Sequence, residues 1–251
     1  MIDLHSHILA GIDDGARTLD ESYEMARAAV REGVTAVAAT PHVRADFPTR
    51  AEEMESAVTT LNNHLATNEI DLEVLPAGEV GLEWLDTMSQ DEIKRFSIAQ
   101  TGRYVLVELP LIGWPLSLGA QVFTLRSAGI TPLLAHPERN PEVQTNPAVL
   151  EHLVRSGARV QVTAASLQGR FGRRAHQACR RLLELGLVHV LASDAHAPGA
   201  RDSSLAQAVA ALRDDGLARY LTREVPAAIV SGEPVPFRSA ENRRRRRFIL
   251  F

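Results

Sequence analysis

The sequence is poor in cysteine and in long apolar runs. Cys179 is the only cysteine among the 251 residues, which excludes an internal disulfide and fits a reducing cytoplasm. No apolar run approaches the roughly 18 residues that a membrane-spanning helix needs. The first residues also lack the basic and apolar regions of a secretory signal. These absences predict a cytoplasmic protein without an integral membrane segment.

The chain has no excess of positive charge either. Its net charge is −4, whereas dedicated nucleic-acid-binding domains are usually basic. The one concentrated basic run is Arg243–Arg247, so the rest of the chain is more acidic than the net charge suggests. We therefore expect no nucleic-acid partner, and we assign residues 236–251 to an Arg-rich C-terminal tail.

Apolar, β-rich segments alternate with helix-patterned ones along the chain. The expected strands are Ile2–Ile8, Val34–Ala39, Leu72–Leu75, Tyr104–Leu109, Ile130–Ala135, Ala158–Val162 and Val188–Ala192. The expected helices are Leu19–Arg31, Ala51–Ala66, Leu116–Ala128, Pro147–Ser156 and Arg173–Leu185. Most of these helices are followed by a glycine, as helix C-termini often are, at Gly33, Gly129, Gly157 and Gly186. This alternation is typical of an α/β fold with a parallel sheet and helical crossovers.

The short apolar strands favour a closed or nearly closed barrel over an open sheet. Barrels of this kind accommodate 251 residues as one domain. No linker, repeat or low-complexity tract precedes the last dozen or so residues. We therefore expect a single barrel domain over residues 1–235.

Potential metal ligands follow almost every expected strand. His5 and His7 are one residue apart, so in an extended strand both imidazoles project from the same face. Further histidines and carboxylates stand at later strand ends and in the first loop, namely Asp13, Asp14, His42, Glu79, Glu108, His136, Asp194 and His196. Only the strand that ends in Gln161-Val162-Thr163 supplies none. The carboxyl ends of barrel strands form one rim, where barrel enzymes build their active sites.

The number of these residues is what indicates a metal site. A single His or Glu at a strand end is more often a loop polar group or a helix cap than a ligand. Burying many carboxylates and imidazoles together without counter-charge is very costly, and divalent cations supply that charge. Because one metal accepts about four to six protein ligands, the set requires two or three metals. A ligand set without thiolate suits manganese, iron or zinc.

The motifs resemble those of the polymerase and histidinol phosphatase (PHP) superfamily. The resemblance rests on His5-x-His7, Thr40-Pro41-His42, Gly78-Glu79, Glu108, His136-Pro137-Glu138-Arg139 and Ser193-Asp194-x-His196. Residues 1–7, the Asp13-Asp14-Gly15 loop and Leu187–His196 are most similar to one branch, the bacterial capsule- and exopolysaccharide-associated protein-tyrosine phosphatases. The resemblance extends from residue 1 to about residue 230. It implies a distorted (β/α)7 TIM-like barrel, the PHP fold, with three divalent metal ions, usually manganese.

The resemblance also implies how the ligands are shared among three metals. The first metal would take His5, His7, Glu79 and Asp194. Glu79 would bridge to a second metal that is held also by Glu108 and His136. The third metal would take Asp14, His42 and His196.

Two arginines are expected to bind the substrate phosphate. The resemblance assigns this role to Arg139 and Arg201, and both lie close in sequence to expected ligands on rim loops. The guanidinium group matches phosphate oxygens in a bidentate fork, although an isolated surface arginine is more often simply solvated. His42, Arg139 and Arg201 are therefore the candidate catalytic residues. Arg44, on the loop after His42, is a further candidate for substrate binding.

The expected reaction is phosphate monoester hydrolysis by a metal-activated hydroxide. Metals and arginines would stabilise the charge on the equatorial phosphate oxygens. The phenol leaving group of tyrosine has a pKa near 10, so it departs without a strong general acid. A cysteine-dependent phosphatase is disfavoured, because a Cys-x5-Arg loop that starts at Cys179 would place Leu185 where the arginine belongs.

The resulting hypothesis is a metal-dependent protein-tyrosine phosphatase. By resemblance, its partner would be a bacterial tyrosine autokinase that regulates capsule or exopolysaccharide synthesis. One alternative is a PHP phosphoesterase for a small molecule such as histidinol phosphate, and another is a metal-binding regulatory module that has lost catalysis. The Arg243–Arg247 run is most simply a solvated tail, with attraction to anionic lipid or to an acidic kinase tail as alternatives.

Overall fold

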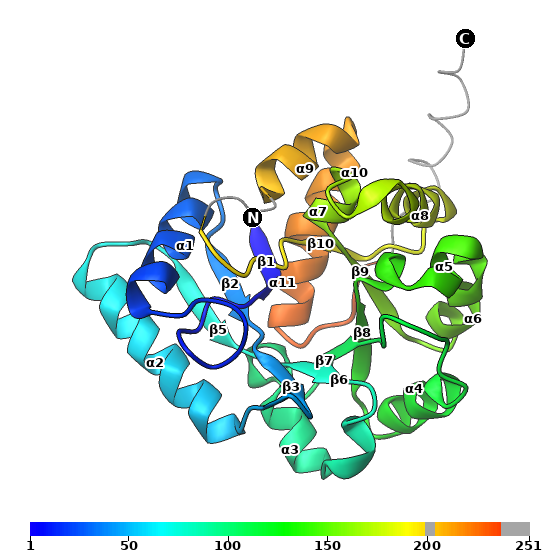
Figure 1. Cartoon of the computed structure of the whole chain (residues 1–251), viewed down its shortest axis with the longest axis horizontal. Helices are drawn as coiled ribbons and strands as arrows, with labels where there is room; N and C mark the ends of the chain where they lie inside the picture. Colours follow the sequence, from blue (N-terminus) through cyan, green and yellow to red (C-terminus); the bar gives the residue numbers. More distant parts are fainter. Residues whose placement is uncertain (199–203, 237–251) are drawn as a thin grey trace.

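The computed structural model describes residues 1–198 and 204–236 (Figure 1). Its strands are β1 (Ile2–Ser6), β2 (Ala36–Ala39), β3 (His42–Arg44), β4 (Phe47–Pro48), β5 (Glu73–Pro76), β6 (Glu79–Gly81), β7 (Tyr104–Glu108), β8 (Thr131–Ala135), β9 (Arg159–Thr163) and β10 (Val190–Ala192). Its α-helices are α1 (Leu19–Arg31), α2 (Ala51–Thr67), α3 (Gln90–Arg95), α4 (Leu118–Ser127), α5 (Pro141–Thr145), α6 (Leu150–Arg155), α7 (Ala164–Leu167), α8 (Gly172–Leu185), α9 (Leu205–Leu212), α10 (Asp215–Arg219) and α11 (Val225–Val230). Short 3-10 turns include η3 (Pro137–Arg139), and a π-helical segment, η5 (Tyr220–Glu224), joins α10 to α11.

The strands form two sheets that are parallel except at one edge. One sheet has the order β1-β2-β5, and the other has the order β10-β9-β8-β7-β6-β3-β4 with an antiparallel β3–β4 pair. β3 follows β2 closely along the chain and pairs with β6, which follows β5, so the two sheets adjoin there. On the other side, His7 donates a backbone hydrogen bond to Ala195 (2.8 Å), which links the end of β1 to the segment after β10. Most helices lie around the outside of the strands, whereas α11 lies in the middle of this view and contacts β1 (Figure 1).

The predicted mixed α/β fold with parallel strands is confirmed. Every expected strand is present with ends within about two residues of the expected ones, and so are the expected helices. The sequence prediction missed β3, β4 and β6, because strands of two or three residues carry no readable periodicity. It also named no helix after β10, where the structure has α9, α10, η5 and α11.

The central strands are buried along their whole length. Every residue of β7 and β8 is buried, because helices cover the outer face of a parallel sheet and side chains fill its inner face. The glycines expected to end helices do so with left-handed backbone, as at Gly186, the C-cap of α8 (φ 70°). Because neighbouring strands run parallel, their carboxyl ends lie on one side of the molecule.

No helix within the described ranges is long and apolar enough to cross a membrane. Arg201 and Arg243–Arg247 lie outside the described residues. The division into a domain at residues 1–235 and a tail at 236–251 therefore stays a prediction.

His189 predicts a loss of stability in mild acid. Its Nδ1 accepts a hydrogen bond from the Val160 backbone N–H (3.2 Å), and burial together with the Arg159 charge lowers the pKa of His189 to about 3. In the unfolded chain His189 has the ordinary histidine pKa of about 6.5, so as the pH falls the unfolded state takes up a proton before the folded state does. Neutral His189 therefore contributes fully to the stability of the fold above about pH 6.5, and this contribution is lost progressively as the pH falls below that value. At pH 5 the loss is about 2 kcal/mol in the free energy of unfolding.

Chemical denaturation at pH 7 and pH 5 tests this prediction. His189→Asn keeps an acceptor in place of Nδ1 but cannot titrate, so its stability should fall less between the two pH values than that of the wild type. The matched control is His152→Asn on α6, where the side chain is exposed. Equal pH dependence of the wild type and His189→Asn would contradict the prediction.

Candidate metal centre

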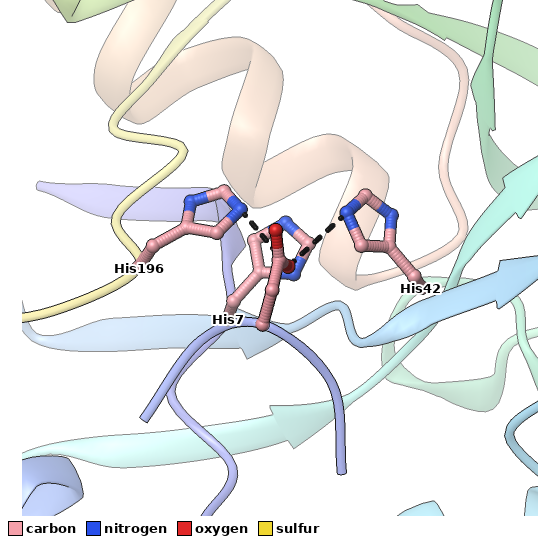
Figure 2. A group of neighbouring side chains, drawn as sticks. His7, His42 and His196 are labelled. Carbon is pink, nitrogen blue, oxygen red and sulfur yellow. Dashed lines mark ion pairs between the residues drawn. The ribbon is translucent and has the colours of Figure 1, made fainter. Parts of the chain in front are cut away.

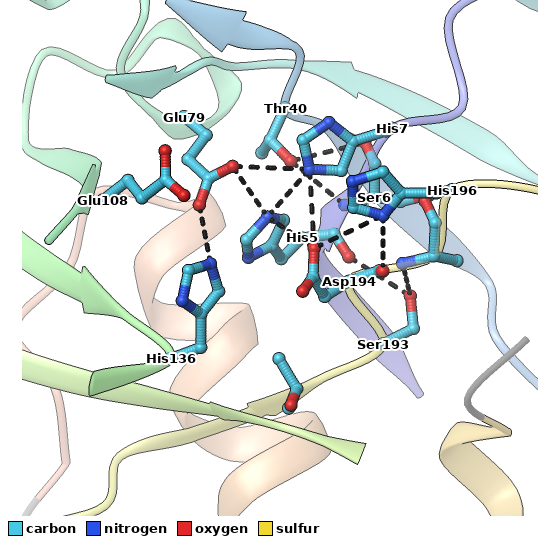
Figure 3. A network of polar contacts seen from close by, with 12 residues as sticks. His5, Ser6, His7, Thr40, Glu79, Glu108, His136, Ser193, Asp194 and His196 are labelled. Carbon is cyan, nitrogen blue, oxygen red and sulfur yellow. Dashed lines mark hydrogen bonds and ion pairs between the residues drawn. The ribbon is translucent and has the colours of Figure 1, made fainter. Parts of the chain in front are cut away.

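The expected ligands come together at the carboxyl ends of the strands (Figure 3). His5 lies on β1, His42 on β3 and Glu79 on β6, all buried. The others lie at or just beyond strand ends, at His7, Glu108, His136, Asp194 and His196. Parallel strands deliver their C-terminal residues to the same edge, which is why residues so distant in sequence meet here.

Glu79 is the centre of the cluster. Its carboxylate oxygens lie 2.9 Å from His136 Nε2, 2.9 Å from His42 Nδ1, 3.3 Å from His5 Nε2 and 3.4 Å from His7 Nε2. The Glu79 side chain is fully buried. Burial opposes its ionisation, but the positive charge of His5, the hydrogen bond with His136 and the other imidazoles nearby hold the pKa of Glu79 well below its usual range. Glu79 is therefore a buried anion that needs several positive groups around it.

His5 and His7 project from the same face of the β1 segment, as their spacing predicts. Their Nε2 atoms are 3.1 Å apart, and Asp194 Oδ1 lies 3.2 Å from His5 Nε2 and 3.5 Å from His7 Nε2. Burial opposes protonation of His5, yet the charges of Glu79 and Asp194 raise the pKa of His5 to about 9. The same carboxylates that favour a positive imidazole attract a divalent cation, which competes with protons for these nitrogens.

A second group of imidazoles faces Asp14 (Figure 2). Asp14 Oδ1 lies 3.5 Å from both His42 Nε2 and His196 Nε2, and the His7 ring stacks on the His196 ring with centroids 3.9 Å apart. Asp14 has a side chain that is 46% exposed, whereas Glu79 is inaccessible. This group is therefore the more solvent-accessible part of the centre.

Two of these residues have strained backbone. His136 (φ 32°) and Asp194 (φ 57°) lie in the left-handed region, which residues other than glycine rarely adopt. Such strain costs about 1–3 kcal/mol per residue and is concentrated at functional sites. The His136 N–H donates to Gln161 Oε1 (3.2 Å), and the Asp194 N–H donates to the His5 carbonyl (2.9 Å), so both conformations are supported by the strands next to them.

Asp13 and Gln161 orient His7 and His5, and sequence reasoning did not assign this role to either. Asp13 Oδ2 lies 2.7 Å from His7 Nδ1, and Gln161 Oε1 lies 3.2 Å from His5 Nδ1. An acceptor at Nδ1 holds the ring proton there and leaves the Nε2 lone pair for a metal. Gln161 lies on β9, the strand expected to supply no ligand, and its only sequence signal is a polar residue between two buried valines.

A histidine nitrogen and a carboxylate oxygen in the cluster face each other without forming a hydrogen bond. His42 Nδ1 and Glu79 Oε2 are 2.9 Å apart, but both are buried and neither makes a hydrogen bond among the described residues. Buried polar atoms without partners are rare, because each one costs about 1–3 kcal/mol. Metal ligands typically point their nitrogen or oxygen atoms toward a common centre and not toward each other. The residues of this cluster therefore fit a site for divalent cations.

The structure arranges the expected ligands in overlapping groups. Ligand atoms lie within 4.8 Å of one another in four sets: His5, His7 and Asp194; His5, Glu79 and His136; His42, Glu79 and Glu108; and His7, Asp14, His42 and His196. The first set holds three of the four ligands predicted for the first metal, without Glu79, and the last set holds the three predicted for the third metal together with His7. The predicted second group is divided, since Glu108 and His136 each meet Glu79 beside a different histidine.

The candidate phosphate-binding arginines differ in their surroundings. Arg139 Nη1 lies 3.2 Å from Asp194 Oδ2, and the guanidinium carbon of Arg139 is 4.5 Å from the centre of the Phe171 ring. Arg44 Nη1 lies 2.6 Å from Glu108 Oε2, and its Nε lies 2.9 Å from Asp46. The structure thus places Arg139 beside the cluster with its side chain 26% exposed, whereas Arg44 is paired with two carboxylates.

Comparison with known proteins identifies the family. The family described as "Capsular polysaccharide synthesis, CpsB/CapC" matches residues 1–229. The chain belongs to the CpsB/CapC family. This agrees with the resemblance to the capsule-associated branch that the motifs indicated.

Relatives of this CpsB/CapC member are named as phosphatases. Tyrosine-protein phosphatase YwqE of Bacillus subtilis is 41% identical over 199 residues, which are 78% of this chain and 77% of YwqE. Putative tyrosine-protein phosphatase CapC of Staphylococcus aureus is 31% identical over the same shares of the two chains.

Solved structures agree in fold. One from work on YwqE from Bacillus subtilis and CpsB from Streptococcus pneumoniae, "unique metal-dependent tyrosine phosphatases", has a TM-score of 0.86 and 36% identity, and the match covers 95% of this chain and 97% of that one. A β-aspartyl dipeptidase from Fervidobacterium islandicum has a TM-score of 0.53 at 14% identity, with 91% of this chain and 74% of that one covered, so it shares the fold alone.

Asp13 is expected to matter for metal affinity in this CpsB/CapC member. Besides its bond to His7, Asp13 accepts backbone hydrogen bonds from His42 and Gly15 (2.9 Å each), and these contacts hold the pKa of its buried carboxyl at about 2. Asp13→Asn keeps the shape but removes the charge that orients and polarises His7. We expect metal affinity to fall by about 10–100-fold, as measured by calorimetric titration of metal-depleted protein with Mn²⁺.

The control for Asp13→Asn is Asp20→Asn, an exposed carboxylate at the start of α1. Asp20→Asn should leave the affinity unchanged. An Asp13→Asn protein that binds Mn²⁺ as tightly as the wild type would show that Asp13 is only a loop-closing residue.

Proposed function

We propose that this chain is a metal-dependent protein-tyrosine phosphatase. The observation that carries the proposal is Glu79 with four histidines directed at its carboxylate, buried at the strand ends beside Arg139. The phosphatase names of YwqE and CapC support the same activity. Of the alternatives that the sequence left open, a small-molecule phosphoesterase has no support among these relatives. The complete ligand cluster argues against a module that has lost catalysis.

We propose that the centre holds three divalent ions, with manganese the expected metal. His5, His7, Glu79 and Asp194 would hold the first, Glu79, Glu108 and His136 the second, and Asp14, His42 and His196 the third. The four overlapping groups support this sharing, with Glu79 between sites. Bound divalent ions would supply Lewis acidity toward phosphate oxygens and would make water a nucleophile at neutral pH.

The chain's own residues would bind and orient the phosphate. Arg139 presents guanidinium donors at the accessible side of the cluster, where they match two phosphate oxygens and compensate charge that builds up in the transition state. Arg201, five residues after His196 in the sequence, would provide a second guanidinium group. His42, with one ring nitrogen toward Glu79 and the other toward Asp14, would connect the buried and open groups. The phenol leaving group, with a pKa near 10, requires no dedicated acid.

We also propose that the strands form a distorted (β/α)7 barrel, with residues 1–235 as one domain. The continuity of β2 with β3 and of β5 with β6, and the hydrogen bond from His7 to Ala195, support closure of the ring. The proposed substrate is a phosphotyrosine protein in the cytoplasm, specifically a tyrosine autokinase of polysaccharide export. The family's role in capsular polysaccharide synthesis supports this partner.

The decisive experiment compares three substrates at equal concentration: a phosphotyrosine peptide, the matching phosphoserine peptide and histidinol phosphate. Each is tested with added Mn²⁺ and after exhaustive chelation. We expect hydrolysis of the phosphotyrosine peptide with Mn²⁺ and loss of activity on chelation that is restored by metal. A strong preference for histidinol phosphate, or full activity without metal, would overturn the proposal.

A further inference from the structure

The first turn of α8 lacks the acidic residues that the first turns of α1 and α2, the two other longest helices, carry. α1 carries Asp20 and Glu21 in its first turn, and α2 carries Glu52 and Glu53 there, as the helix dipole favours. α8 has no acidic residue in its first turn and carries Arg173 and Arg174 instead. Cations at this end of a helix oppose the dipole, so local stability does not explain them.

Both arginines are exposed and unpaired. Within the described part of the chain, neither Arg173 nor Arg174 forms an ion pair, and both are open to solvent. The carboxylate of α8 itself, Glu184, lies in its last turn and pairs with Arg181 (3.0 Å). The inner face of α8 is anchored by buried Ala175, Ala178, Cys179 and Leu182, which turns the arginines outward.

The start of α8 adjoins the metal centre. Phe171, the residue just before α8, is 46% exposed, and its ring stacks against the Arg139 guanidinium at 4.5 Å. Arg139 in turn lies 3.2 Å from Asp194 of the cluster. α8 also packs against η3, the turn that carries Arg139. These contacts place the first turn of α8, which carries Arg173 and Arg174, next to the segment that contacts the cluster through Arg139 and Phe171.

We infer that Arg173 and Arg174 form a docking surface for negative charges that flank the phosphotyrosine in an anionic peptide. This inference rests on the proposed phosphatase function and specifies its substrate class. The complementary partner is a peptide with acidic residues or further phosphates next to the target tyrosine, because unpaired guanidinium groups bind carboxylate and phosphate oxygens well. The remainder of the acidic chain would repel such a peptide, which makes this surface selective.

The test uses three substrates with the full-length, Mn²⁺-loaded protein. One phosphotyrosine peptide has glutamates on both sides of the tyrosine, the second has glutamines at the same positions, and the third substrate is free phosphotyrosine. For the wild type we expect kcat/KM to be about 5–10-fold higher for the glutamate peptide than for the glutamine peptide, the size that two exposed charge pairs provide. The preference should disappear in 0.5 M salt because the charges are exposed.

The double variant R173Q/R174Q should lose this preference through a higher KM for the glutamate peptide, with kcat and free phosphotyrosine turnover unchanged. The matched control is R180Q/R181Q, which removes the same charge from exposed positions about two turns further along α8. This control should keep the preference. Thermal unfolding of both variants verifies that the exposed substitutions leave the fold intact.

Three results would overturn the inference. The first is a wild type with equal kcat/KM for the two peptides, and the second is an R173Q/R174Q variant that keeps the preference. The third is loss of binding to phosphatidylserine vesicles in R173Q/R174Q without any change in peptide preference, which would assign the arginines to a membrane surface. A wild type that hydrolyses no phosphotyrosine substrate at all would instead overturn the phosphatase proposal, and this inference with it.

Discussion

Replacing Glu79 with glutamine is expected to abolish phosphatase activity and to release bound metal. Glu79 is the only carboxylate in contact with His5, His7, His42 and His136 together among the described residues. Glutamine preserves the side-chain volume but removes the negative charge that compensates the positive charge of the bound metal ions. For Glu79→Gln we expect kcat/KM to fall by at least about 10³-fold, which corresponds to a loss of about 4 kcal/mol of transition-state stabilisation.

Metal content by mass spectrometry and steady-state rates on a phosphotyrosine peptide measure this effect. Circular dichroism should show an unchanged fold, because the strands of the sheet remain hydrogen-bonded without metal. The matched control is Glu83→Gln, an exposed glutamate shortly after β6, which should retain metal and activity. A Glu79→Gln protein with full metal content and wild-type rates would remove the proposed metal centre.

Arg139→Ala is expected to lower kcat/KM by about 10²–10³-fold while metal content stays the same. Arg139 contacts the cluster through Asp194 (3.2 Å), and its guanidinium group stacks on the Phe171 ring. Removing it takes away donors for phosphate oxygens but leaves the expected ligands. Arg139→Lys should recover only part of the loss, because an ammonium group cannot form the bidentate fork.

The control for Arg139 is Arg155→Ala on α6, an exposed arginine that pairs with Glu151 (3.1 Å). It should have no effect on the rate. The same peptide assay and metal measurement apply to all these variants. Unchanged kcat/KM in Arg139→Ala would exclude Arg139 from phosphate binding, whereas a loss of metal would indicate that it acts by holding Asp194.

The location of the candidate centre was predictable because it depends on local patterns. The spacing of His5 and His7 requires both side chains to face the same way on a strand, and the structure places their Nε2 atoms 3.1 Å apart. The other expected ligands follow apolar strands, and parallel strands bring their carboxyl ends to one edge. Periodicity and strand-end position are properties of short segments, so they are visible without the fold.

The contacts within the centre were less predictable. Nothing local distinguishes Asp13, which supports His7, from its neighbour Asp14, which faces His42 and His196. Gln161 is an amide on a buried strand, and its function follows only from the 3.2 Å approach to His5 across the fold. Pairing of Arg44 with Glu108 was likewise not expected, because the two residues belong to different strands. Ångström-scale distances between loops depend on how helices and strands pack.

The order of residues in this chain specifies the alternation of strands and helices and the set of imidazoles and carboxylates at one edge. These features follow from side-chain polarity and from backbone periods of two and 3.6 residues, which act over a few residues at a time. Tertiary packing establishes Glu79 as the shared carboxylate, the strained backbone of His136 and Asp194, and the contact of Arg139 with Phe171. These features join residues that are far apart in sequence, so they arise only when the strands have come together.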